Sequence, residues 1–84
     1  MTRKEALLKH RDEYLYKKVA YEIELELLKQ YKDDEVYATR KEKSFLGKEV
    51  EKKITVADRK NFLLRQIAAI DRIIGVIDAM INKK

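Results

Sequence analysis

The chain has 84 residues, of which 42% are charged, and its formal net charge is +5. A chain of this length forms one domain at most and buries only about 60% of the surface that its unfolded form exposes. It contains no cysteine, which excludes disulfides and thiolate metal sites, and no proline, which together with the many charged and aliphatic residues is typical of helical proteins. We therefore expect a single all-α domain over residues 1–84 whose small core is completed by self-association.

The sequence gives no sign of export or of membrane insertion. No apolar segment of signal-peptide length follows Met1, so we expect a cytoplasmic protein. The most apolar stretch, residues 62–81, carries Asp71 and Asp78 besides two arginines, which argues against a membrane span. The net charge favours an anionic partner, although a charge of this size also serves solubility alone.

Residues 2–32 are predicted to form one long helix, because they contain no helix breaker and their charges recur in helical register. Lys4, Arg11 and Lys18 are seven residues apart, which places them in one narrow charged row. The remaining circumference is apolar on two sides, formed by Leu8, Leu15, Val19 and Ile23 and by Tyr14, Tyr21, Leu25 and Leu28. One neighbouring helix covers only one of these sides, so the pattern predicts an oligomer.

A second helix is predicted at residues 34–52, after the pair Asp33 and Asp34, whose carboxylates suit the free amide groups at a helix start. Its apolar pattern is thin, with Leu46, Val50 and Ile54 spaced four residues apart on one expected face. This segment is also the most basic part of the chain. We expect it to dock shallowly on its neighbours.

A third helix is predicted at residues 56–82. Thr55, followed three residues later by Asp58, resembles a capping box at its start. Its apolar residues share one broad face, formed by Phe62, Leu63, Ile67, Ile70, Ile73, Ile74, Ile77, Met80 and Ile81. We expect this face to supply most of the core.

The residue types that catalysis requires do not gather anywhere in the sequence. His10 is the only histidine, and no nucleophile is spaced with it as a catalytic pair. Among Glu22, Glu24 and Glu26, only the first and last share a helix face, and the Glu-x-x-His spacing of di-iron bundles is missing. There is no glycine-rich phosphate loop. We therefore expect a protein that is not an enzyme and that uses no cofactor or metal.

All five tyrosines lie in the first half of the chain, interleaved with lysines. Aromatic rings stack on bases and ammonium groups neutralise phosphate, so this combination suits a nucleotide. Tyr16, Lys17 and Lys18 are the candidate ligand-binding residues, because the ring of Tyr16 is followed directly by two cations. The alternative is that the tyrosines are core or interface residues whose hydroxyl groups reach water.

Part of the third predicted helix resembles a known family. The resemblance lies in Leu63, Leu64, Gln66, Ala69, Ile70, Ile73, Val76, Ile77 and Ile81. These are similar to the closing helix of the small helical-hairpin proteins that phages use against CBASS immunity. The resemblance implies a compact helical oligomer that sequesters cyclic nucleotides without cleaving them. It covers only this last helix and identifies no ligand-binding residue.

Three functions follow as hypotheses. The first is a non-enzymatic oligomer that sequesters an anionic small ligand such as a cyclic nucleotide. The second is a helical protein–protein interaction module, an inhibitor or adaptor that presents a helix face to a protein target. The third is a nucleic-acid-binding helical protein, which the mixed charges of the third helix disfavour. The expected partners are a second copy of the chain and either the nucleotide or the target, without a membrane.

Overall fold

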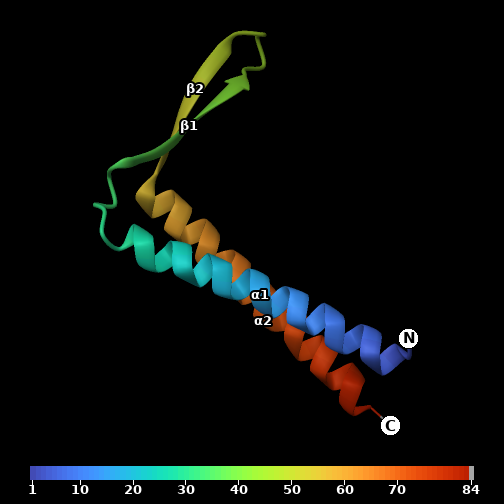
Figure 1. Cartoon of the computed structure of the whole chain (residues 1–84). Coiled ribbons are helices and arrows are strands. Elements are labelled where there is room, and N and C mark those ends of the chain that lie inside the picture. The colour runs from blue at the N-terminus through green and yellow to red at the C-terminus, as the bar shows by residue number, and fades with distance from the viewer. Residues whose placement is uncertain (84) are drawn as a thin grey trace.

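The computed structural model describes residues 1–83. Helix α1 (Arg3–Leu28) is followed by strands β1 (Val36–Lys43) and β2 (Glu49–Thr55) and by helix α2 (Val56–Asn82). The helices lie side by side, and the strands form a hairpin, here called the arm, that projects from the end of the helical pair opposite the two termini (Figure 1). The prediction of an all-α fold is therefore wrong, because a two-stranded antiparallel sheet takes the place of a helix.

The helical pair has a narrow core along the line where α1 and α2 face each other, here called the seam. The buried side chains of α2 recur every seven residues, at Val56, Leu63, Ile70 and Ile77. Such spacing keeps one row of side chains against a partner helix, as in a coiled coil. On α1, Leu28 is buried against this row, and Tyr21 and Leu25 pack around it.

Helix α2 confirms the sequence prediction in its bounds and in the centre of its apolar face. Leu63 is fully buried, and Ile67 and Ile74 are half-buried beside the row. Ile73 and Met80 belong to the predicted face, but more than a third of each remains exposed. The seam is therefore narrower than the apolar surface of α2.

Both helices begin at a threonine cap. The Thr2 hydroxyl accepts a hydrogen bond from the Glu5 amide. At α2, the Thr55 hydroxyl accepts from the Asp58 amide while the Asp58 carboxylate accepts from the Thr55 amide, each at 3.2 Å. This capping box confirms the predicted start of α2 and satisfies two amide groups that a helix leaves free.

The arm replaces the helix predicted at residues 34–52. In the arm, β1 and β2 pair antiparallel, with Ala38 opposite Ile54 and Lys43 opposite Glu49. The Ser44 amide donates to the Lys48 carbonyl at 2.7 Å, and Gly47 has a φ of 78°, a conformation that glycine adopts at little cost. The sequence does not separate the two structures cleanly, because a spacing of four residues places side chains on one face of a strand as well as of a helix.

The start of the arm is fastened to the start of α2. The Val56 amide donates to the Glu35 carbonyl at 2.9 Å, and the Ala57 amide donates to the Asp33 carbonyl at 3.1 Å. The Lys60 ammonium group lies 2.8 Å from the Asp33 carboxylate. Asp33 therefore belongs to a turn that leads into β1 and does not open a helix, which corrects the predicted role of the acidic pair.

The molecule is elongated. Its extents are 55 × 35 × 18 Å, and its radius of gyration is 18.0 Å. A compact chain of this length has a radius of about 12 Å. The extended shape leaves both sides of the helical pair and the whole arm open to other molecules (Figure 1).

Candidate functional site

The predicted ligand site is divided between two sides of α1. Tyr16 faces solvent with 79% of its surface exposed, and the ammonium group of Lys17 lies 5.7 Å from the centre of the Tyr14 ring. Lys18 points into the seam instead, where its Nζ atom lies 2.7 Å from the Asp71 carboxylate. The structure thus brings Tyr16 and Lys17 together and separates Lys18 from them.

Tyr16 and Lys17 line a shallow concavity of about 570 Å³ on the outer side of α1. Lys9 adds a second ammonium group, whereas Asp12 and Glu13 add two carboxylates. An anion there meets repulsion as well as attraction, because the charges balance. One helix alone supplies this surface, so it has no opposing wall against which a base could be enclosed.

Lys18 is held by two carboxylates. Besides Asp71, Glu22 lies 3.9 Å from its Nζ atom. The hydrogen bond to Asp71, opposed in part by desolvation and reinforced by both negative charges, raises the pKa of Lys18 above its ordinary value of 10.5. The cation is therefore engaged in an intramolecular ion pair at the edge of the seam and is not free for a phosphate group.

A second charged cluster surrounds Arg59 near the start of α2. Its guanidinium group donates two hydrogen bonds to Glu24 of α1, at 2.5 and 3.0 Å. The ring centres of Tyr37 and Phe62 lie 5.4 and 4.9 Å from its central carbon. These hydrogen bonds, opposed in part by desolvation, raise the pKa of Arg59. Arg59 thereby joins α1, α2 and the arm in one contact.

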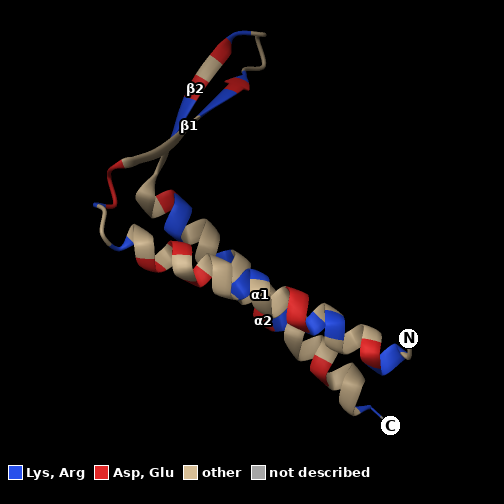
Figure 2. Ribbon diagram, viewed as in Figure 1, with Lys and Arg blue, Asp and Glu red and all other residues tan. Residues whose placement is uncertain are grey.

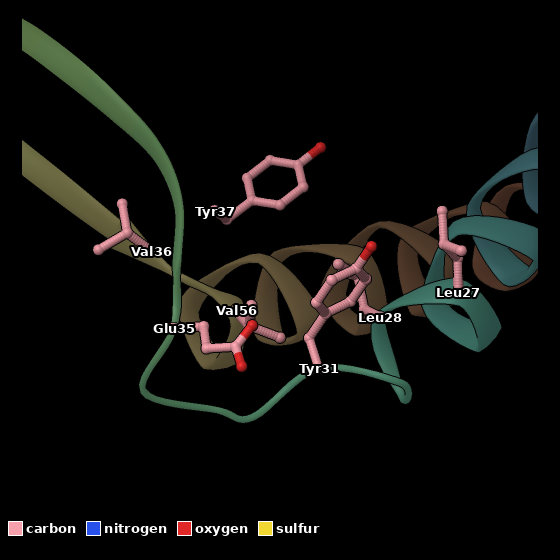
Figure 3. A pocket seen from close by; sticks show the side chains of 7 residues that line it. All are labelled: Leu27, Leu28, Tyr31, Glu35, Val36, Tyr37 and Val56. Carbon is pink, nitrogen blue, oxygen red and sulfur yellow. The ribbon is translucent and has the colours of Figure 1, made fainter.

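An apolar pocket lies at the corner where the arm meets the helices; we call it the corner pocket. It has a volume of about 310 Å³, and its lining consists of Leu27, Leu28, Tyr31, Glu35, Val36, Tyr37 and Val56. Tyr31 and Tyr37 approach the same space from the loop and from the arm, and the Glu35 carboxylate points toward Tyr31 (Figure 3). The β-sheet register shifts at Tyr37, and such irregularities re-aim a side chain.

Sequence reasoning missed the corner pocket. Its members are spread from residue 27 to residue 56, and they meet only because the chain reverses twice between the helices. The sequence does hold one signal, the two tyrosines that bracket the acidic run at Asp33, Asp34 and Glu35. Asp33 and Asp34 suit a helix start equally well, so the sequence alone does not indicate a pocket here.

Two apolar surfaces remain uncovered on the helical pair. The α1 flank is formed by Leu8, Leu15, Val19 and Ile23, which are all more than 40% exposed. These are the residues of one predicted apolar side of the first helix, whereas the other predicted side faces the seam. The α2 flank is formed by Phe62, Ile73, Val76 and Met80, of which Val76 is 60% exposed.

The ion pairs place these flanks on opposite sides of the seam. Leu8 and Leu15 precede Glu22 by multiples of seven residues, so they share its side, which is the side of Lys18 and Asp71. Ile73 and Met80 follow Arg59 by multiples of seven residues, so they lie on the side where Arg59 binds Glu24. The helical pair therefore has one apolar surface on each of its two broad sides.

Within residues 1–83, no three acidic, histidine or cysteine side chains are placed to hold a metal ion. In the same range, neither helix combines the length and apolarity needed to cross a bilayer. No protein-family model, curated protein or solved structure matches the chain.

Proposed function

We propose that the chain is a non-enzymatic interaction module that works as an oligomer of helical hairpins, held together through the α1 and α2 flanks. The observation that carries this proposal is the pair of uncovered apolar surfaces on opposite sides of one thin helical pair. Monomeric proteins rarely expose contiguous apolar surfaces of this kind without a partner. The partner with the matching chemistry is the flank of another copy.

The exposed area supports the same conclusion. The chain exposes 7087 Å², whereas a compact monomer of this size exposes about 5,200 Å². The excess of about 1,900 Å² per copy is about twice the roughly 800 Å² that each partner contributes to an interface of standard size, so it corresponds to one interface at each of the two flanks. Association through the flanks therefore brings the exposed area of each copy toward that of an ordinary folded protein.

The test is the mass of the protein in solution, measured by light scattering across a concentration series. The wild type should be larger than a monomer, and Leu15→Glu or Ile73→Glu should reduce the mass, because each variant places a charge in a flank without touching the buried row. Ala79→Glu is the matched control, since Ala79 is exposed outside both flanks. A wild type that stays monomeric at all concentrations, or flank variants that keep the full mass, would contradict the proposal.

A second candidate function is capture of an anionic ligand such as a cyclic nucleotide at Tyr16 and Lys17. It is supported by the exposed ring of Tyr16 between the ammonium groups of Lys9 and Lys17. A neighbouring copy at the α1 flank would supply the wall that the concavity lacks in one chain. Calorimetry with a panel of cyclic di- and trinucleotides tests this candidate.

In that experiment, Tyr16→Ala and Lys17→Ala should each weaken binding about tenfold, the effect of losing one stacked ring or one charge-assisted hydrogen bond. Both side chains are exposed, so thermal melting should stay unchanged. An absence of heat with every nucleotide would remove this candidate and leave the interaction module.

A further inference from the structure

The tip of the arm presents two apolar side chains to solvent. Phe45 is fully exposed, and 81% of Leu46 is exposed. The turn beneath them is well defined, because the Ser44 amide binds the Lys48 carbonyl and the Gly47 amide binds the Ser44 carbonyl at 2.9 Å. An aromatic and an aliphatic side chain held outward on an ordered turn are suited to entering a pocket on another molecule.

The corner pocket lies at the opposite end of the arm and is of matching character. Its wall is mainly apolar, and Leu27, Tyr31 and Val36 are each about half exposed around it. Its volume of about 310 Å³ is at the lower end of the range for ligand pockets, a size that suits one or two side chains. The tip of the same chain is about 26 Å away along β1, so it cannot fill its own pocket.

The strands between tip and pocket each have one unpaired edge. The sheet contains only β1 and β2, and nearly all of its residues are exposed on both faces. An isolated two-stranded hairpin is marginally stable, and a free edge is a template for another strand. The arm therefore has three features without a partner: its tip, the corner pocket beside its base, and its free edge.

We infer that the arms of two copies lie antiparallel against each other, so that the tip of each copy enters the corner pocket of the other. A twofold axis through the middle of the paired arms places each tip at the partner's base, since the two arms have the same length. One arrangement thus gives a partner to the tip, the pocket and the edge. This arrangement involves the arm and the corner pocket but neither helical flank, so it is independent of association through the flanks.

Strand β1 is the edge that best fits this arrangement, because β1 begins at the corner pocket. With Lys43 of one copy opposite Val36 of the other, Arg40 faces Thr39 and Lys41 faces Ala38 across the twofold axis. No two cations then lie directly opposite each other, a pairing that would be destabilising. Phe45 follows Lys43 by two residues and so reaches the level of the partner's pocket.

The tip carries Lys43 and Lys48 and the base carries Asp34 and Glu35, although Glu42 and Glu49 beside the turn leave residues 42–49 with no net charge. The ribbon is red in the loop that leads into β1 and blue at the turn of the arm, with further red segments beside the turn on β1 and β2 (Figure 2). Within residues 1–83, Asp34 and Glu35 at the base and Lys43 and Lys48 at the tip form no ion pair. Such charges contribute to orientation and encounter more than to affinity, and here they favour the reciprocal, tip-to-base arrangement.

Disulfide trapping tests the contact directly, because the chain has no cysteine of its own. Leu46→Cys on one tagged copy and Glu35→Cys on another should form a mixed disulfide on mild oxidation, since a disulfide requires Cα atoms within about 7 Å. The control pair combines Leu46→Cys with Glu13→Cys, an exposed position on the outer side of α1. The tip–base pair should cross-link about tenfold faster or more, and equal rates would overturn the inference.

A second measurement keeps the inference separate from the proposed function. The double variant Phe45→Ser and Leu46→Ser should weaken association through the arms about tenfold or more, whereas Val50→Ser, on β2, should not. The flank variant Leu15→Glu should retain the tip–base cross-link even if it loses mass. Loss of mass in flank variants alone, with an unchanged mass in the tip variant, would overturn the arm pairing and leave the flanks as the interface.

The chain also lacks tryptophan, so Phe45→Trp provides a single reporter at the tip. Its emission should move to shorter wavelength as protein concentration rises, because the ring leaves water for the partner's pocket. If the emission maximum does not change with protein concentration but shifts when vesicles of phosphatidylserine and phosphatidylcholine are added, the tip binds a lipid surface. That result would overturn the inference.

Discussion

Arg11 and Lys18 occupy positions of the α1 repeat where a helical seam usually carries leucine or isoleucine. Their heads reach carboxylates at the edge of the seam, Asp78 and Asp71, each at 2.7 Å. Both side chains are only partly exposed, 37% for Arg11 and 27% for Lys18, and long cationic side chains at such positions cover apolar surface with their methylene stems. Arg11 and Lys18 of the predicted charged row therefore face the partner helix, and the apolar residues beside them form the α1 flank.

Arg59 should be the most important charged residue for stability. Its side chain forms paired hydrogen bonds with Glu24, and each of the two side chains is only about a quarter exposed. The guanidinium group also lies against the rings of Tyr37 and Phe62. Arg59→Ala should therefore lower the free energy of unfolding by about 1–3 kcal/mol in urea titrations. Arg11→Ala removes the ion pair with Asp78, which is more exposed than the pair of Arg59 and Glu24. This variant should therefore lower the free energy of unfolding by less than about 1 kcal/mol. An equal loss in the two variants would contradict this ranking.

The pKa of Lys18 gives a prediction about alkaline pH. Because its pKa is raised in the folded state, the ion pair with Asp71 contributes fully below the unfolded value of 10.5 and is lost as pH rises through the folded value. The difference in unfolding free energy between wild type and Lys18→Met should stay constant from pH 7 to about pH 10 and shrink above it. Subtracting the variant removes the titration of all other groups. A difference that shrinks below pH 9 would refute the assignment.

At the scale of elements, α2 could be predicted and the arm could not. Helix α2 begins at a capping box and repeats Leu63, Ile70 and Ile77 at a helical spacing, so local and long-range signals agree. In the arm, Val50 and Ile54 satisfy both a helical and a strand pattern. The hairpin turn contains Gly47 with a positive φ, but a glycine in a sequence does not show which turn it will form.

The seam of α2 yields the sharpest prediction for an element. Leu63 is fully buried, whereas its neighbour Leu64 is 52% exposed, so the two positions share residue type and helix context but not packing. Leu63→Ala should lower the free energy of unfolding by about 2–5 kcal/mol, because it removes buried methyl groups and leaves a cavity. Leu64→Ala should change it by under about 1 kcal/mol. Similar losses, measured by urea unfolding at one protein concentration, would mean that the seam is placed wrongly.

At the scale of the whole molecule, the candidate site was only partly predictable. Neighbours in sequence suggested one cluster of Tyr16, Lys17 and Lys18, but adjacent residues on a helix point about 100° apart, and the packing of α2 decides which of them is covered. The corner pocket depends on the double chain reversal between Leu28 and Val56. The two apolar sides of the first helix were predicted correctly, but the sequence alone did not indicate which of them α2 covers.

The arm should keep its direction when the protein is made monomeric. Its base is fixed by the hydrogen bonds of Val56 and Ala57 to the preceding loop, and Tyr37 lies against Arg59. Nothing comparable holds the tip against the helices, since Phe45 and Leu46 are exposed. The arm therefore projects because its base is rigid, and its direction does not depend on a second copy.

Small-angle scattering on a variant that carries Leu15→Glu, Phe45→Ser and Leu46→Ser tests this rigidity. The changes are confined to exposed side chains, so the monomer should retain a radius of gyration near the 18.0 Å of the single chain. A collapsed arm would bring the radius toward the value of about 12 Å for a compact chain. A radius close to that lower value would show that the arm folds back when it lacks a partner. Pairing of arms would then require an opening step before association, and cross-linking between tip and base would be slow and independent of protein concentration.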